Sequence, residues 1–298
     1  MPQRVAVVTD TTHYLPRDLI ERNAVHEVSL YVNWQGRTDR EADLLGFDGY
    51  YEHLRTTEEL PTTSQPSVGD FVAVYEPLLA DGGDVVSVHL AAGLSGTFES
   101  AQQARQRLEE EGKGGERISI IDSETACGGE GFLVLAAVAA ARAGRSGEEV
   151  AAHTLEAREH LKMWFSIDTM EFLRRGGRVG AARAWLGSTL KIKPILTVES
   201  QITPVERVRT SRRAFERMVD YMCSRKEAGA DAWVVQHIQA PDEAAELVAR
   251  GREVFGNDPV FVSEVGPVIG THVGPGLLGT GGLPARYIEG VLDLMRDY

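Results

Sequence analysis

The 298-residue sequence has only two cysteines, few aromatic residues and fewer basic than acidic residues. Cys127 and Cys223 form no Cys-x-x-Cys pair, so the sequence indicates neither a disulfide framework nor a cysteine-rich metal site, and a reducing compartment suits it. Lys and Arg number 31 against 44 Asp and Glu, and the net charge of −13 repels phosphate backbones and anionic lipid surfaces. Nucleic acid is therefore not an expected partner.

Long hydrophobic runs are also missing. The longest uncharged apolar stretch, residues 131–141, has eleven residues, whereas a membrane-spanning helix needs about 20. The first ten residues lead directly into a strand-like run and lack the charged, apolar and small-residue regions of a secretory signal. We therefore expect a cytoplasmic protein without integral membrane association. A composition of 43% hydrophobic and 25% charged residues is typical of a globular protein with one large or two ordinary domains.

The first half of the chain repeats a strand, a polar loop and a helix three times. Repeats of this kind predict a parallel, doubly wound α/β sheet. The predicted strands are residues 4–8, 84–90 and 117–121, and the predicted helices are residues 16–23, 97–110 and 131–143.

The second half mixes helices with hairpin-like extended segments, which favours an α+β unit with a mixed or antiparallel sheet. We therefore predict two domains, an N-terminal α/β domain over residues 1–158 and a C-terminal α+β domain over residues 159–298. The glycine-rich stretch 266–282 is predicted to form turns that bring the backbone close to a ligand. The other segments expected here are helices at 148–161, 211–226 and 241–254, and extended segments at 191–198, 201–208, 232–238 and 259–265.

Polar side chains follow the predicted strands, where ligands of open parallel sheets usually bind. Residues 9–12 (TDTT) follow the first strand, and Asp10 is either a ligand contact or a helix cap. Residues 61–67 (PTTSQPS) contain four hydroxyls and two prolines. Ser67 has the spacing of an N-cap, three residues before an aspartate, whereas Thr63 and Ser64 exceed what a cap needs and are predicted to contact a ligand.

Ser95 lies between glycines in residues 93–97 (GLSGT), at a strand-to-helix turn whose free N–H groups favour an anion such as a carboxylate. The alternative is the Gly-x-Ser-x-Gly elbow of a hydrolase, but Thr97 replaces the last glycine. A hydrolase would also need a base and an acid; His272 is available as a base, and no acid stands out.

His272 lies in a glycine-rich segment, 270–276 (GTHVGPG), so it can contact an anion or brace the loop. His153 and His160, seven residues apart, lack the third ligand of a zinc site. The basic residues of 174–178 (RRGGR) form either a solvated face or a site for an acidic partner or a phosphate.

In this order the motifs resemble those of the DegV family over nearly the whole chain. The resemblance rests on the motifs TDTT with Leu15-Pro16, TTSQPS at 62–67, LSGT with Glu99-Ser100-Ala101, LRRGGR at 173–178, KPIL at 193–196, Arg209-Thr210 and HVGPG at 272–276. The sequence departs from the family pattern at Thr11, at His13-Tyr14 and at Ser200, where the family usually has a glycine.

The resemblance implies a two-domain fold that holds a long-chain fatty acid in a buried tunnel between the domains, with the carboxylate on Thr63 and Ser95 and with His272 supporting. Family members act as the fatty-acid-binding subunit of bacterial fatty acid kinases and present the carboxylate to a separate ATP-binding kinase protein that makes acyl-phosphate. Arg175 and Arg209 would face that partner or the phosphate. The chain would then have no catalytic residue, cofactor or metal of its own. The alternatives are a hydrolase or acyltransferase using Ser95 and a module for another small carboxylate. The further candidate ligand-binding residues are Asp10, Thr11, Ser64, Gly96, Thr97 and Thr271.

Overall fold

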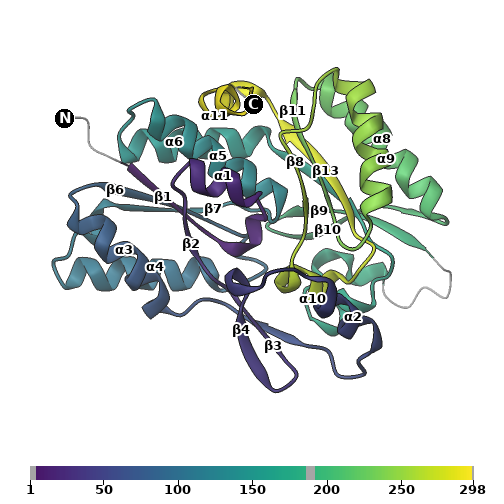
Figure 1. The fold of residues 1–298 in the computed structure, drawn as a ribbon, viewed down its shortest axis with the longest axis horizontal. Helices are drawn as coiled ribbons and strands as arrows, with labels where there is room; N and C mark the ends of the chain where they lie inside the picture. The colour runs from purple at the N-terminus through teal and green to yellow at the C-terminus, as the bar shows by residue number, and fades with distance from the viewer. Residues whose placement is uncertain (1–4, 186–191, 297–298) are drawn as a thin grey trace. The chain divides into compact units, whose positions relative to one another are not determined.

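The computed structural model describes residues 5–185 and 192–296, which form two compact units (Figure 1). Unit 1 contains the described residues up to Leu30, then Gln65–Leu161 and the residues from Ala285 onward, and unit 2 contains Tyr31–Ser64 and Lys162–Pro284. The main division after Leu161 lies close to the predicted boundary at 158/159. The segment 31–64 falls within the predicted N-terminal domain but groups with unit 2. The residues from Ala285 onward fall within the predicted C-terminal domain but group with unit 1. None of the helices described is long and apolar enough to cross a membrane.

Unit 1 is built on a four-stranded parallel sheet in the order β2-β1-β6-β7. Its strands are β1 (Val5–Asp10), β2 (His26–Val28), β6 (Asp84–His89) and β7 (Ile118–Asp122). Valines such as Val8 and Val85 are fully buried because both faces of a parallel sheet are covered. In Figure 1, α3 (Val68–Ala80) and α4 (Thr97–Glu110) lie on one face of the sheet, and α5 (Gly128–Arg142) and α6 (Gly147–His160) lie on the other. The predicted doubly wound sheet is confirmed.

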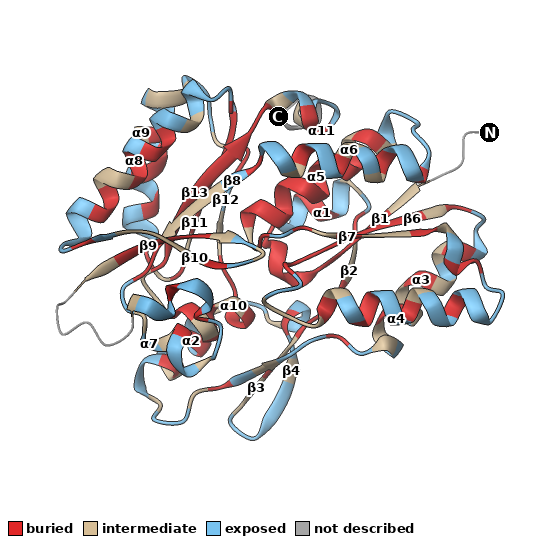
Figure 2. Cartoon of the chain, turned by 180° about the vertical axis from the view of Figure 1, so that it is seen from behind, coloured by how far each residue is buried: buried red, intermediate tan, exposed pale blue. Residues whose placement is uncertain are grey.

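Helix α5 is buried on nearly all sides, as its red colour in Figure 2 shows. It packs against β1 and β6 of the sheet and also against α6 and α11 (Glu289–Arg296). A helix covered in this way can be rich in alanine and leucine around its whole circumference. The remaining short helices of unit 1 are α1 (Arg17–Arg22) and the 3-10 turns η1 (Thr11–His13), η3 (Gly115–Arg117) and η5 (Ala285–Tyr287).

Unit 2 contains a six-stranded sheet in the order β10-β9-β8-β13-β11-β12, antiparallel except for the parallel pair β11 and β12. Helices α8 (Ser211–Glu227) and α9 (Pro241–Phe255) share a core with the sheet that includes Met218, Trp233 and Leu247. The predicted mixed sheet is confirmed. Its strands are β8 (Lys162–Ser166), β9 (Lys193–Glu199), β10 (Gln201–Val208), β11 (Ala232–His237), β12 (Phe261–Glu264) and β13 (Leu278–Leu283). Residue 191 of the predicted extended segment 191–198 lies outside the described residues.

The glycine-rich stretch 266–282 is more regular than predicted, because it forms helix α10 (Pro267–Val273) and most of the interior strand β13. Gly281 and Gly282 belong to β13, and a Cβ on them would lie 2.2 and 2.1 Å from the carbonyl oxygens of Lys162 and Ala232. Glycine here permits close strand packing, and positive φ angles in this stretch occur at Gly274 and Gly276.

A small antiparallel sheet of order β4-β3-β5 also belongs to unit 2, and hydrophobic periodicity did not predict it because its strands have three or four residues. Next to it in sequence, helix α2 (Asp48–Thr56) carries the buried Tyr51, whose hydroxyl donates to the carbonyl of Val265 at 2.6 Å. The strands are β3 (Tyr31–Trp34), β4 (Arg37–Arg40) and β5 (Thr62–Ser64), and the other short helices of unit 2 are η2 (Glu41–Asp43), α7 (Glu171–Arg175) and η4 (Gly180–Trp185).

Candidate ligand-binding site

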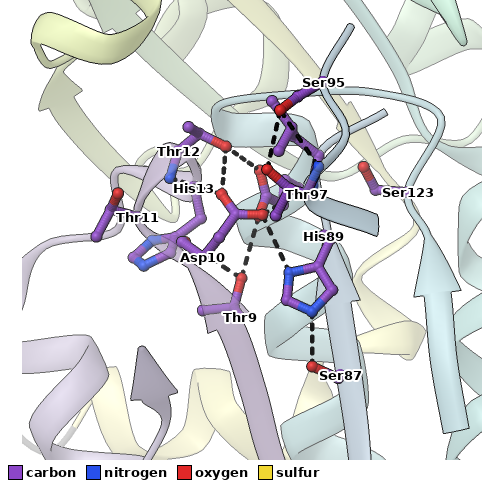
Figure 3. Close-up of polar contacts among 12 residues, drawn as sticks. Thr9, Asp10, Thr11, Thr12, His13, Ser87, His89, Ser95, Thr97 and Ser123 are labelled. Carbon is purple, nitrogen blue, oxygen red and sulfur yellow. Dashed lines mark hydrogen bonds and ion pairs between the residues drawn. The ribbon is translucent and has the colours of Figure 1, made fainter. Parts of the chain in front are cut away.

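Ser95 lies in the turn that joins the carboxyl end of β6 to the first residue of α4 in unit 1 (Figure 3). Its hydroxyl lies 2.9 Å from the hydroxyl of Thr97 and accepts the Thr97 N–H at 3.3 Å. Thr97 is fully buried, whereas Ser95 is half-buried. When Thr97 donates its hydroxyl hydrogen to Ser95, the hydrogen of Ser95 is left to point outward. In that arrangement, one of the two that the contact allows, Ser95 is a hydrogen-bond donor to another group.

Gln65 fixes this turn, and sequence reasoning did not single it out. Its side-chain amide donates to the carbonyl of Gly96 at 3.1 Å and to the hydroxyl of Ser100 at 2.8 Å. A Cβ at Gly96 would lie 2.2 Å from the Gln65 side-chain oxygen, so only glycine fits without displacing that side chain. Gly96 therefore allows the Gln65 side chain to pack closely against the turn.

The Ser95 turn lacks the strained backbone expected of a hydrolase elbow, because Ser95 does not have a positive φ. Its hydroxyl bonds to Thr97 within the same turn rather than to a base. These features favour hydrogen bonding over nucleophilic attack by Ser95.

Thr63 and His272 meet in unit 2. Thr63 is the central residue of β5, and its hydroxyl lies 2.9 Å from Nε2 of His272 in α10. The other ring nitrogen of His272, Nδ1, is buried without a hydrogen-bond partner among the described residues. A Cβ at Gly176 would lie 2.4 Å from that nitrogen, so the glycine of the LRRGGR motif makes room for the ring.

His272 is a neutral imidazole at physiological pH. Burial, followed by the nearby charge of Arg178, lowers the pKa of His272 to about 4. An N–H at the partnerless Nδ1 would be a buried unsatisfied donor, so we assign the hydrogen to Nε2, where it donates to Thr63. The hydroxyl hydrogen of Thr63 then remains available for another acceptor.

Two other candidates of unit 2 differ in their surroundings. Thr271 is buried, donates to the carbonyl of Pro267 at 2.6 Å and lies 2.6 Å from the hydroxyl of Tyr50. Because its single hydrogen is used within α10, Thr271 supports the helix and has no hydrogen left for a ligand. Ser64, at the end of β5, is exposed.

Asp10 and Thr11 are also occupied by the protein itself. Asp10 is fully buried and caps η1, where its carboxylate accepts the Thr12 N–H at 3.0 Å, which confirms the cap interpretation. Thr11 is buried, and its hydroxyl accepts the Leu30 N–H at 3.3 Å. Both side chains therefore bond to other parts of unit 1, whereas the prediction was that they contact a ligand.

The two residues that depart from the family pattern next to this turn are buried as well. His13 lies 3.0 Å from a carboxylate oxygen of Glu27 through Nε2, and its Nδ1 accepts the Leu15 N–H at 2.7 Å. Tyr14 is 8% exposed and ends η1 with a positive φ of 47°. Their side chains therefore contribute to the packing of unit 1.

The arginines of the basic patch are exposed in unit 2. Arg174 forms two bonds to Glu171, whereas Arg175 donates to the carbonyl of Glu58 at 2.6 Å and Arg178 to that of Gly176 at 2.8 Å. Arg209 is exposed immediately before the N-cap of α8. Arg175 bonds to a carbonyl oxygen, and its charge is one of those that lower the pKa of the nearby Glu171 carboxyl.

No cluster of three or more metal-ligating side chains occurs within residues 5–185 and 192–296. His153, half-buried in α6, lies 3.0 Å from the carbonyl of Tyr287 through Nε2, and the ring of His160 stacks on that of Tyr287. Both histidines therefore have a packing role in unit 1.

Comparison with known proteins identifies the family. A family model described as "Uncharacterised protein, DegV family" matches residues 4–284. The chain belongs to the DegV family. Protein DegV of Bacillus subtilis is 35% identical over 280 residues, which cover 92% of this chain and 97% of the relative.

Solved structures of DegV proteins share the fold over nearly the whole chain. A DegV family protein from Thermus thermophilus, described by its fatty acid binding, is similar with a TM-score of 0.84 at 34% identity, covering 94% of this chain and 99% of that one. DegV from Bacillus subtilis, described as a fatty acid binding protein, gives a TM-score of 0.83 at 35% identity and covers 94% and 98%. The resemblance inferred from the motifs is confirmed.

Proposed function

We propose that this chain binds a long-chain fatty acid, whose carboxylate accepts hydrogen bonds from the hydroxyls of Thr63 and Ser95. Two DegV structures at 34% and 35% identity are described as binding fatty acids, and they support this choice of ligand. His272 supports the site by donating to Thr63, and Thr97 supports it through its N–H, which donates to the Ser95 hydroxyl.

The observation that carries the proposal is the same at both residues: each hydroxyl lies within hydrogen-bond distance of a neighbour that can donate to it and so leave its own hydrogen for the ligand. His272 fulfils that role for Thr63, and Thr97 for Ser95. A carboxylate is an acceptor only, so it matches hydroxyls that have a hydrogen to offer. The start of α4 adds a favourable dipole next to Ser95.

The acyl tail supplies most of the affinity. Each buried CH₂ contributes roughly 0.8 kcal/mol, so a sixteen-carbon tail contributes on the order of 10 kcal/mol before the cost of ordering. The hydroxyls contribute orientation, and no lysine is needed beside a carboxylate that is bound in this way.

The bound carboxylate is then presented to a separate ATP-dependent kinase in the cytoplasm. In that reaction a carboxylate oxygen attacks the γ-phosphorus of ATP, ADP leaves and acyl-phosphate forms. Arg175 and Arg209 are exposed cations that suit contact with the kinase or with the transferred phosphoryl group. The catalytic groups belong to the kinase, and this chain supplies the ligand.

Mass spectrometry of lipid extracted from the purified protein tests the ligand. Near-stoichiometric fatty acid is expected, and its absence would count against the proposal. Thr63→Ala and Ser95→Ala should each weaken retention, and the double variant should lose most of the lipid while remaining folded. Thr62→Ala on the exposed neighbour in β5 and Ser119→Ala in β7 are matched controls that should retain lipid. Covalent labelling of Ser95 by a fluorophosphonate would instead favour the hydrolase.

Phosphorylation with the cognate kinase tests the arginines. Arg175→Ala and Arg209→Ala should retain lipid but slow acyl-phosphate formation at least tenfold. Arg252→Ala is the control, because Arg252 is an exposed arginine of α9 paired with Asp258. Equal turnover of all three variants would remove the role proposed for the two arginines.

A further inference from the structure

Seven polar side chains form a cluster inside unit 1 that the proposed function does not use. We call it the Asp10–Glu130 cluster, and all of its members are 0% exposed. Two buried carboxyl groups in one small cluster are unusual, because burial disfavours their charged form. The members are Thr9, Asp10, Thr12, Tyr75, Ser87, His89 and Glu130.

One arm of the cluster runs to Asp10 through His89. The Tyr75 hydroxyl donates to the Ser87 hydroxyl at 2.7 Å, and that hydroxyl lies 2.7 Å from Nε2 of His89. The hydrogen of Ser87 therefore points at Nε2, which leaves the ring hydrogen on Nδ1. Nδ1 then donates to Oδ2 of Asp10 at 3.1 Å (Figure 3). In this assignment His89 is neutral and Asp10 carries the negative charge.

Thr12 decides the state of Glu130. Its hydroxyl lies 2.6 Å from Oδ1 of Asp10 and 2.8 Å from Oε2 of Glu130, but it has one hydrogen. When that hydrogen goes to Asp10, Glu130 must bring its own and donate from Oε2 to Thr12. Oε1 of Glu130 then accepts from Thr9 at 3.1 Å. The cluster thus holds one charge, on Asp10, and one acidic proton, on Glu130.

The direction of the pKa shift of Glu130 agrees with this hydrogen count. Burial, followed by the charge of Asp10, raises the pKa of Glu130 well above its usual value. Burial alone would raise the pKa of Asp10 as well, but the hydrogen bond and the electrostatic attraction of His89, together with the hydrogen bonds from Thr12, outweigh it and hold that pKa below its usual value.

The charged member of the cluster also holds the beginning of the Ser95 turn. Oδ2 of Asp10 accepts the N–H of Leu90, the first residue after β6, at 3.1 Å. The next residue, Ala91, donates to the carbonyl of Thr125 at 2.7 Å and accepts the Ser95 N–H at 3.3 Å. Three hydrogen bonds therefore connect the Asp10 carboxylate and the β7–α5 loop to the backbone of Ser95.

We propose that Asp10 is a positioning residue, whose buried charge holds the Leu90–Thr97 turn so that Ser95 donates to the ligand, while the proton on Glu130 keeps a second charge out of the interior. The inference rests on the proposed function, since it needs a ligand carboxylate at Ser95. It changes the predicted role of Asp10 from ligand contact to support of the turn.

Affinity for a fluorescent fatty acid, measured beside thermal unfolding of the full chain, tests this. Asp10→Asn should weaken binding at least tenfold, because an amide cannot accept from Thr12, His89 and Leu90 together. Leu79→Ala in α3 is the control, since it removes a buried core side chain of unit 1 outside the cluster. At a temperature where both variants are folded, the control should bind within about twofold of the parent. Equal affinities of Asp10→Asn and Leu79→Ala would overturn the proposal.

Two milder changes keep the proposal testable if Asp10→Asn does not fold. Thr12→Val removes the hydroxyl between the two carboxyl groups, and it should weaken binding and speed amide hydrogen exchange at Leu90 and Ser95. Glu130→Ala should also weaken binding, and Glu130→Gln should restore it, because the amide keeps one donor and one acceptor. Binding by Thr12→Val equal to the parent, or equal loss in both Glu130 variants, would contradict the assigned hydrogen bonds.

Ser95→Ala separates this inference from the proposed function. If Ser95→Ala binds as tightly as the parent, the proposed carboxylate contact is wrong and the positioning role is wrong with it. If Ser95→Ala weakens binding and the Asp10 and Thr12 variants do not, the contact stands and the positioning role alone is refuted.

Discussion

Replacing His272 with glutamine should remove an acid-sensitive part of the stability of the lipid-free protein. Burial, followed by the charge of Arg178, lowers the pKa of His272 to about 4, whereas an unfolded chain titrates near 6.5. Between these values the unfolded state binds a proton that the folded state does not bind, so stability falls as the pH falls from about 6.5 to about 4. The interval of about 2.5 pH units corresponds to about 3 kcal/mol of unfolding free energy.

Urea denaturation at half-unit steps between pH 4 and pH 7 measures the effect. Glutamine keeps an N–H near the position of Nε2, so its bond to Thr63 can survive while the titrating group is lost. The free energy of unfolding of the parent should fall by about 3 kcal/mol more than that of His272→Gln over this range. His160→Gln, at an exposed histidine of α6, is the control and should follow the parent. Parallel curves for the parent and His272→Gln would refute the argument that burial keeps this imidazole neutral.

Three further predictions use the same denaturation assay. Gly176→Ala should lower the free energy of unfolding by about 1–3 kcal/mol, because the new Cβ would lie 2.4 Å from Nδ1 of His272. Gly49→Ala in α2, where no atom lies within 4 Å of the new Cβ, should raise it by roughly 0.5–1 kcal/mol. Ser200→Gly should stabilise by about 0.5–1 kcal/mol, because Ser200 has a φ of 62°, and an unchanged midpoint would contradict this. The free energy of unfolding of Glu130→Gln should rise relative to that of the parent by about 1.4 kcal/mol per pH unit above pH 4.5. The reason is that the pKa of Glu130 is raised in the folded state, so the parent loses stability as the pH rises. A constant difference between the two proteins would show that Glu130 is ionised in the fold.

The sequence predicted the regular elements of unit 1 well because their signals are local. Helix α4 begins at Thr97 after a glycine turn and ends at Glu110, as its charge pattern indicated, and Ser67 caps α3 with Asp70 completing the capping box. The polar loops after β1 and β6 follow strands of the parallel sheet, as predicted. Thr63 and Ser64 do not, because they belong to β5 of the small antiparallel sheet in unit 2.

Long-range partners were missed for a physical reason. Glu130 lies in the first turn of an apolar helix, where an acidic residue is common, and its role depends on Thr9 and Thr12 more than a hundred residues earlier. In the sequence His89 is only the last residue of a strand, and its bond to Asp10 becomes apparent in the structure. Strand β13 was read as turns, because its glycines suit close strand packing as well as loops, and no local pattern separates the two.

The interior place of β13 has a consequence for how the chain acquires its fold. In the larger sheet of unit 2, β13 alone joins the group β8–β10 to the pair β11–β12, and it is the last strand of that sheet to be synthesised. Until Leu278–Leu283 leaves the ribosome, β8 and β11 each present an unpaired edge, which is a template for pairing with another chain. Chains interrupted before Leu278 should therefore aggregate, and complete synthesis is the step that protects unit 2 from self-association.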